Sequence, residues 1–192
     1  MIPKHSIYLA SASPRRKELL ALLDYPFDVL RVDVPEQQLP LESPDAYVQR
    51  LAHDKSQAGW LACQGTRPVL GADTIVVFEN QVLEKPRDFS DARRMLLLLS
   101  GNTHTVMTAV GLSTSAGCEV IRVESHVSFG ELTEDTIETY WRTGEPADKA
   151  GSYGIQGIGG KFVRHLSGSY SAVVGLPLFE TEHLLHSYFY RS

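Results

Sequence analysis

The sequence has little cysteine and no long hydrophobic run. Its 192 residues include only two cysteines, Cys63 and Cys118, in no ligand-like spacing. No stretch is long and apolar enough to cross a membrane, and none resembles a secretory signal peptide, so we expect a reduced, cytoplasmic, soluble protein. The seven histidines form no His-x-x-x-His pair and no cluster with cysteine. A zinc site is therefore not expected, and any metal should be a hard cation bound by oxygen atoms.

An excess of positive charge is also absent. The net charge of −5 argues against nucleic-acid binding, which requires a basic field around the phosphates. A basic cluster nevertheless occurs at Arg15, Arg16 and Lys17. Within an acidic chain, this cluster indicates a local site for a small anion.

Predicted strands and helices alternate along the chain, which is typical of an α/β fold. The predicted strands cover residues 7–10, 27–32, 69–78, 82–83, 104–114, 119–129 and 162–166. The predicted helices cover residues 14–23, 44–61, 91–99, 134–143 and 178 onward, with Ser90 and Asp91 expected to cap the third. Pairing of the central strands as a hairpin favours a mixed sheet. No stretch resembles a linker, so we expect one domain over residues 1–192.

The first predicted helix begins with charges of the wrong sign for a helix alone. Ser13 is a favourable N-cap, and Pro14 suits the first helical position. The three cations that follow oppose the helix dipole, which favours negative charge there by up to ~1 kcal/mol per group. A bound anion such as phosphate explains them, and a solvated basic turn is the alternative.

Two charged residues interrupt apolar patterns. Lys55 falls near the centre of the apolar face of the helix that begins at Pro44, where it either extends along the core edge to solvent or meets an anion in a cleft. Asp73 interrupts the buried strand of residues 69–78, so it must be paired, bind metal or face a cleft, because an unpaired buried carboxylate is costly. An Asp that ends a strand and caps a turn is the alternative for Asp73.

Two predicted loops carry residues suited to a phosphorylated ligand. Glu84 and Lys85, before Pro86, offer a carboxylate for metal and a cation for phosphate, although the segment alone resembles an ordinary loop. Gln156 lies in the glycine-rich stretch 151–160, which fits neither a Walker loop nor a dinucleotide-binding fingerprint. Its amide both donates and accepts hydrogen bonds, which suits a flat ligand, while a tight structural connection remains the alternative.

Five motifs occur in order along the chain: Leu-Ala-Ser-Ala-Ser-Pro-Arg-Arg (9–16), Gly-Ala-Asp-Thr (71–74), Glu-Lys-Pro (84–86), Gly-Ser-Tyr-Gly-Ile-Gln-Gly (151–157) and Val-Gly-Leu-Pro (174–177). Together they resemble the Maf family. This family comprises nucleotide pyrophosphatases linked to inhibition of septum formation. The resemblance implies a mixed α/β sheet flanked by helices, with two lobes around a deep cleft. It also implies hydrolysis of a nucleoside triphosphate to the monophosphate and pyrophosphate with a divalent cation, Mg²⁺ or Mn²⁺.

The resemblance also implies roles for individual residues. Asp73 would accept the proton of the attacking water. Ser11, Arg15, Arg16, Lys55 and Lys85 would bind the phosphates. Glu36 and Glu84 would join Asp73 in binding the metal, although Pro35 stands where many relatives carry a second acid.

Three positions imply the base preference. Arg15, Thr74 and Gln156 are similar to the dTTP/UTP branch, whereas the branch acting on 7-methyl-GTP has Trp, Gln and Glu there. A glutamine amide matches the alternating acceptor and donor groups of uracil or thymine. The alternative is a non-enzymatic, nucleotide-sensing regulator of septum formation. The sequence leaves a homodimer open.

Overall fold

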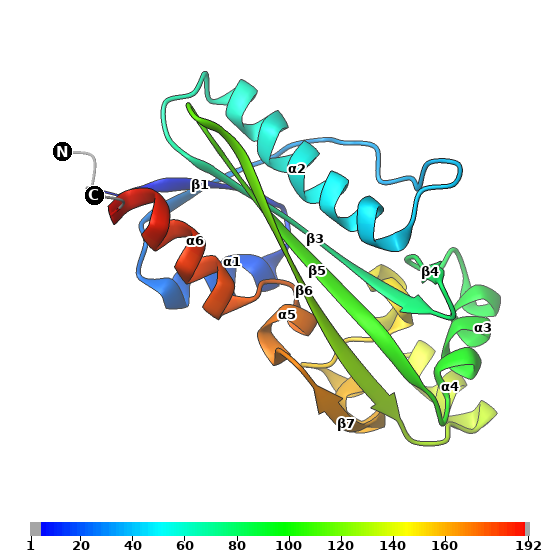
Figure 1. The fold of residues 1–192 in the computed structure, drawn as a ribbon. Coiled ribbons are helices and arrows are strands. Elements are labelled where there is room, and N and C mark those ends of the chain that lie inside the picture. The colour runs from blue at the N-terminus through cyan, green and yellow to red at the C-terminus, as the bar shows by residue number, and fades with distance from the viewer. Residues whose placement is uncertain (1–4, 191–192) are drawn as a thin grey trace. The chain divides into compact units, whose positions relative to one another are not determined.

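A computed structural model describes residues 5–190, whose strands form a seven-stranded mixed sheet (Figure 1). The order is β2-β1-β3-β5-β6-β7, and β4 pairs with β3. The pairs β1–β2 and β1–β3 are parallel, whereas β3–β4 and β6–β7 are antiparallel, which confirms the predicted mixed sheet. The strands are β1 (Ile7–Ala10), β2 (Phe27–Leu30), β3 (Val69–Phe78), β4 (Gln81–Leu83), β5 (Thr103–Thr114), β6 (Gly117–Phe129) and β7 (Val163–Ser167).

Helices fill most of the connections between strands. They are α1 (Pro14–Leu20), α2 (Pro44–Ala62), α3 (Phe89–Leu99), α4 (Glu134–Trp141), α5 (Tyr170–Val174) and α6 (Leu178–Tyr190). Short 3₁₀ helices cover Ala21–Leu23, Glu145–Asp148, Ala150–Ser152 and Ile158–Phe162. Within residues 5–190, no helix combines the length and the hydropathy needed to cross a membrane.

The side chains of Ser13 and Ser43 accept hydrogen bonds from backbone N–H groups of the first turns of α1 and α2, which confirms both as N-caps. The prediction that Ser90 and Asp91 cap α3 was wrong. Asp88 is the cap, because its carboxylate accepts from the Asp91 N–H at 2.8 Å. Asp91 lies inside the first turn, where its own carboxylate accepts hydrogen bonds from arginine side chains.

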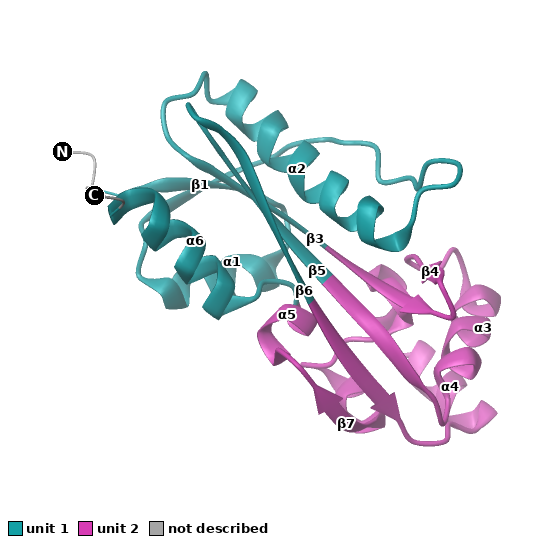
Figure 2. Cartoon of the chain, viewed as in Figure 1, with its two compact units in different colours: residues 1–73, 108–123, 175–192 teal, residues 74–107, 124–174 magenta. Residues whose placement is uncertain are grey.

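Two compact units divide the described chain (Figure 2). Unit 1 comprises residues 1–73, 108–123 and 175–192, and unit 2 comprises residues 74–107 and 124–174. Each unit has its own apolar core: the first is built from β1, β3, β5, α1 and α6, and the second from α3, α4 and the remaining strand segments. The expected single domain over residues 1–192 stays a prediction.

In unit 1, α2 packs unusually close to β3. Leu70 and Ala72 belong to the core with α1 and α6, so alternation along the strand turns Gly71 and Asp73 toward the opposite face, where α2 lies (Figure 1). A Cβ atom at Gly71 would overlap the backbone of Ser56 and lie 2.8 Å from the Ala52 carbonyl oxygen. The absence of a side chain at Gly71 therefore lets α2 bring its apolar-face lysine, Lys55, to the level of Asp73.

In unit 2, a buried histidine contacts the start of the glycine-rich stretch. His104 on β5 is 2% exposed, and its Nε2 lies 2.8 Å from the Tyr153 hydroxyl. Both rings pack edge-to-face with each other and with Phe129. Burial lowers the pKa of His104 to about 4, so the imidazole is neutral at physiological pH.

We predict that replacing Gly71 with alanine destabilises the protein by about 1–3 kcal/mol, because the added methyl group must displace helix backbone. The matched control is Gly130→Ala, where a Cβ atom would lie 3.9 Å from the nearest backbone atom. This variant should change the stability by less than about 0.5 kcal/mol. Thermal or urea denaturation measures both. Equal effects of the two variants would contradict the close packing.

We predict that His104 makes the protein less stable in acid. The ordinary pKa is 6.5 and the folded value is about 4, so the unfolded chain binds more protons between these values. The contribution of the neutral His104 to the free energy of unfolding is complete above pH ~6.5 and is lost as the pH falls toward 4. The total loss is at most about 3 kcal/mol. His104→Gln keeps a polar partner for Tyr153 and should flatten this part of the curve of melting temperature against pH. Parallel curves for wild type and variant would contradict the assignment.

Candidate active site

The centre of the candidate site in unit 1 is a lysine between two carboxylates. Lys55 Nζ lies 2.6 Å from Asp73 Oδ1 and 2.5 Å from Glu36 Oε1. Lys55 and Asp73 are each 7% exposed, whereas the Glu36 side chain is 42% exposed. The sequence left alternatives open for both residues. The structure shows Lys55 buried beside charged groups, and it shows Asp73 as a paired carboxylate. One ammonium shared by two carboxylates leaves this group of three with a net negative charge.

Arg16 and Ser11 adjoin this cluster. The Arg16 Nε donates to the Gly175 carbonyl oxygen at 2.9 Å, and Nη1 donates to Ser11 Oγ at 3.4 Å. Burial lowers the pKa of Arg16 and the neighbouring Arg15 adds to this, while attraction to Asp73 and Glu36 opposes it. Cations and carboxylates thus alternate within one small region of unit 1, an arrangement that suits both phosphate and a metal ion.

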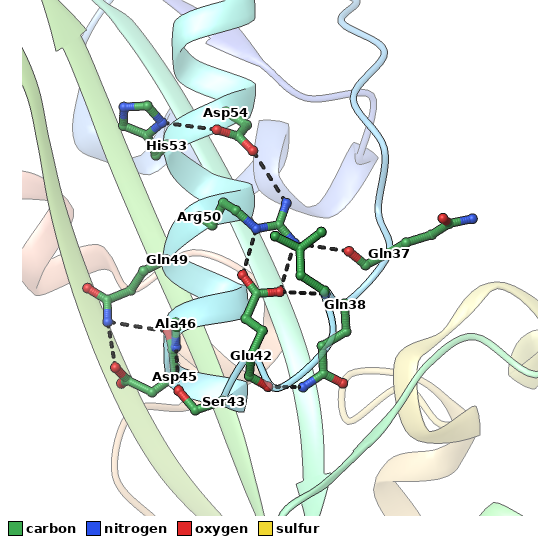
Figure 3. Close-up of polar contacts among 11 residues, drawn as sticks. Gln37, Gln38, Glu42, Ser43, Asp45, Ala46, Gln49, Arg50, His53 and Asp54 are labelled. Atoms are coloured by element: carbon green, nitrogen blue, oxygen red, sulfur yellow. Dashed lines mark hydrogen bonds and ion pairs between the residues drawn. The ribbon is translucent and has the colours of Figure 1, made fainter.

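Glu36 belongs to the loop between β2 and α2, which Arg50 holds to the helix (Figure 3). The Arg50 guanidinium donates through Nε and Nη2 to the two oxygens of Glu42, at 2.6 and 2.9 Å. Nη2 also donates to the carbonyl oxygen of Gln37, the residue after Glu36, at 3.0 Å. The hydrogen bond from Arg50 lowers the pKa of Glu42, so this pair stays ionised. Arg50 therefore fixes the backbone that presents Glu36 to Lys55.

The remaining predicted residues belong to unit 2. Thr74 is half-buried on β3, directly after Asp73. Glu84 and Lys85 are exposed after β4, and the Glu84 carbonyl oxygen accepts a hydrogen bond from the Gly151 N–H at 3.2 Å. Gln156 is exposed in the glycine-rich stretch.

The donors of unit 1 fit a hard divalent cation better than a metal that prefers nitrogen and sulfur ligands, such as Zn²⁺. Glu36 and Asp73 supply carboxylate oxygens, which Mg²⁺ and Mn²⁺ prefer. Among the described side chains, no three of His, Cys, Asp and Glu are grouped as a complete metal site. Binding of Mg²⁺ through one or two carboxylates together with substrate phosphates and water is compatible with such a partial set.

Sequence reasoning missed Arg50 and Glu42. Their pairing is eight residues apart and joins a loop to a helix, so neither residue interrupts an apolar pattern. The only local signal is Asp54, four residues after Arg50, which indicates an ordinary surface pair at 3.5 Å.

Comparison with known proteins identifies the family. Residues 6–188 match the family described as Maf-like protein, so the chain belongs to the Maf family. A protein named dTTP/UTP pyrophosphatase from Pseudoalteromonas atlantica is 58% identical over 182 residues, covering 93% of this chain and 95% of its own length. Another of the same name from Aliivibrio fischeri is 56% identical over 186 residues, covering 95% and 97%.

Solved structures give a weaker similarity. A protein titled nucleoside-triphosphatase / dITP/XTP pyrophosphatase from Mycobacterium abscessus is 16% identical, with a TM-score of 0.46. The match covers 65% of this chain and 74% of that one.

We predict that Arg50→Met loosens the loop that carries Glu36. The Leu39 N–H donates to Glu42 Oε2 at 2.9 Å, so its hydrogen exchange reports whether Glu42 stays in place. Loss of the Arg50 hydrogen bonds should accelerate this exchange about tenfold or more. The control is Arg142→Met, which removes an exposed pair with Glu138 and should leave Leu39 unchanged. Unchanged exchange in the Arg50 variant would show that other contacts hold the loop.

Proposed function

We propose that this protein hydrolyses dTTP and UTP to the monophosphate and pyrophosphate. The observation that carries the proposal is the buried Asp73–Lys55 pair, which Glu36 shares. A buried carboxylate beside lysine and arginine combines a base with charges that attract phosphate. The relatives named dTTP/UTP pyrophosphatase, at 56–58% identity over nearly the whole chain, support the choice of substrate.

In this mechanism Asp73 accepts a proton from the water that attacks the α-phosphorus, and pyrophosphate leaves. The ion pair with Lys55 holds the Asp73 carboxylate in one orientation. Arg16, Arg15, Ser11, Lys55 and Lys85 bind the phosphate oxygens and offset their charge. Positioning and charge neutralisation account for most of the expected rate enhancement.

Metal binding is part of the proposal. Glu36, Asp73 and Glu84 would hold Mg²⁺ or Mn²⁺, which when bound neutralises negative charge on the phosphates. The carboxylate oxygens of Glu36 and Asp73, both within 2.6 Å of Lys55 Nζ, support this assignment.

Base recognition is assigned to three residues. Gln156 pairs through its amide with the imide edge of uracil or thymine, and Arg15 and Thr74 contribute to the same preference. A cytoplasmic location is consistent with the free thiols of Cys63 and Cys118. The sequence leaves a homodimer open, and the absence of nucleic-acid binding stays a prediction.

We predict that Asp73→Asn lowers kcat for UTP and dTTP by roughly 10²–10⁴-fold, while the nucleotide still binds, because the amide cannot accept the proton. Release of pyrophosphate with Mg²⁺ or Mn²⁺ measures turnover, and calorimetry measures binding. Asp28→Asn, at an exposed pair with Arg67, is the control and should retain full activity. Near-normal turnover of the Asp73 variant would remove Asp73 from the mechanism. Binding without turnover in the wild type would instead support the nucleotide-sensing regulator.

A further inference from the structure

The glycine-rich stretch closes around a carboxylate of the protein itself. Glu145 follows α4, in the 3₁₀ helix Glu145–Asp148. Its Oε2 accepts from the Ile158 N–H at 2.8 Å, and its Oε1 accepts from the Gly159 N–H at 3.0 Å. Two successive backbone N–H groups thus bind this carboxylate as such groups bind phosphate in anion sites. All of these residues belong to unit 2.

A buried tyrosine extends the same contact to the other side of Gln156. The Tyr140 hydroxyl donates to Glu145 Oε1 at 2.7 Å and accepts from the Gly154 N–H at 3.2 Å. Its ring is fully buried and packs edge-to-face on Phe162. The backbone is therefore held two residues before and two residues after Gln156, by one carboxylate and one hydroxyl.

The close contacts of Glu145 and Tyr140 explain why glycine stands at positions 157 and 159. A Cβ atom at Gly157 would overlap the Glu145 carboxylate, and one at Gly159 would lie 2.5 Å from the Tyr140 hydroxyl oxygen. Burial disfavours the charged form of Glu145. The hydrogen bonds from Gly159, Tyr140 and Ile158 together outweigh it and lower the pKa of Glu145. The carboxylate is therefore ionised at neutral pH and able to accept all three hydrogen bonds.

We propose that Glu145, with Tyr140, is a positioning residue for Gln156 and thereby sets the selectivity for uracil and thymine. This inference rests on the proposed function, in which Gln156 reads the base. The Gln156 side chain is exposed while Gly154 and Gly159 on either side are buried, so the anchored backbone limits where its amide can point. An amide matches an imide edge only when its donor and acceptor stay in register with that edge.

The test is the ratio of kcat/KM for UTP to that for CTP, whose base has an acceptor at N3 and a donor at C4 where uracil has a donor and an acceptor. In either orientation of its amide, Glu145→Gln places the NH₂ group against a backbone N–H, that of Ile158 or that of Gly159, so at least one hydrogen bond is lost. We expect the UTP/CTP ratio to fall about tenfold, which corresponds to a loss of about 1.4 kcal/mol in free energy. The fall should come mainly from a higher KM for UTP. Tyr140→Phe keeps the buried ring and should lower the ratio less, in the same direction.

A double-mutant cycle separates positioning from general damage. Gln156→Ala should lower the ratio by itself, and Glu145→Gln should add nothing in that background, because the two act through the same amide. The control Glu138→Gln makes the same chemical change in α4 at an exposed pair with Arg142 and should leave the ratio unchanged. An unchanged ratio in the Glu145 variant, or an equal further loss in the Gln156→Ala background, would overturn the proposal.

Failure of the proposed function has a different signature. If the wild type does not hydrolyse UTP, the assignment of substrate fails irrespective of Glu145. Hydrogen exchange at the Ile158 and Gly159 amides then tests the positioning contact directly. These amides should exchange at least about tenfold faster in Glu145→Gln than in Glu138→Gln, and equal rates would reject Glu145 as the residue that holds the loop.

Discussion

Burial of Lys55 beside Asp73 is the constraint on which the rest of unit 1 depends. Removal of Lys55 would leave both Asp73 and Glu36 without their shared ammonium, and loss of one partner of a buried ion pair costs about 3–5 kcal/mol. The pair exists because β3 alternates Asp73 onto the face that α2 covers, and because Gly71 lets that helix approach. Packing and charge placement are therefore one problem in this unit: any change that lifts α2 from β3 separates the two charges as well.

The residues of that pair were visible in the sequence because each interrupts a pattern. A lysine on an apolar helix face and an aspartate in a buried strand both imply a cost that something must offset. The N-caps Ser13 and Ser43 were predictable for a similar reason, since capping is local and each serine precedes a proline that suits the first helical turn. The mixed sheet followed from the spacing of strands and turns.

Other features could not be predicted, because their causes are distant in the sequence. Arg50 fixes the backbone next to Glu36 across 13 residues, and the sequence around Arg50 suggests no more than a solvated helix face. The cap of α3 was misassigned because Asp88, Ser90 and Asp91 are all good capping residues. In the structure Asp88 caps the helix, and the Asp91 carboxylate instead accepts hydrogen bonds from Arg87 and Arg94.

The backbone N–H groups of a glycine-rich stretch often bind an anion, and here the anion is the protein's own Glu145 carboxylate. A carboxylate and a phosphate present similar oxygen acceptors to consecutive backbone N–H groups, so the same spacing of glycines serves either one. Glu145 occupies the backbone N–H groups of Ile158 and Gly159, and these groups are therefore not available to a triphosphate. In the proposed function the stretch contributes to recognition through the side chain of Gln156, and phosphate binding is assigned to the cations, of which Arg16 lies beside the buried pair.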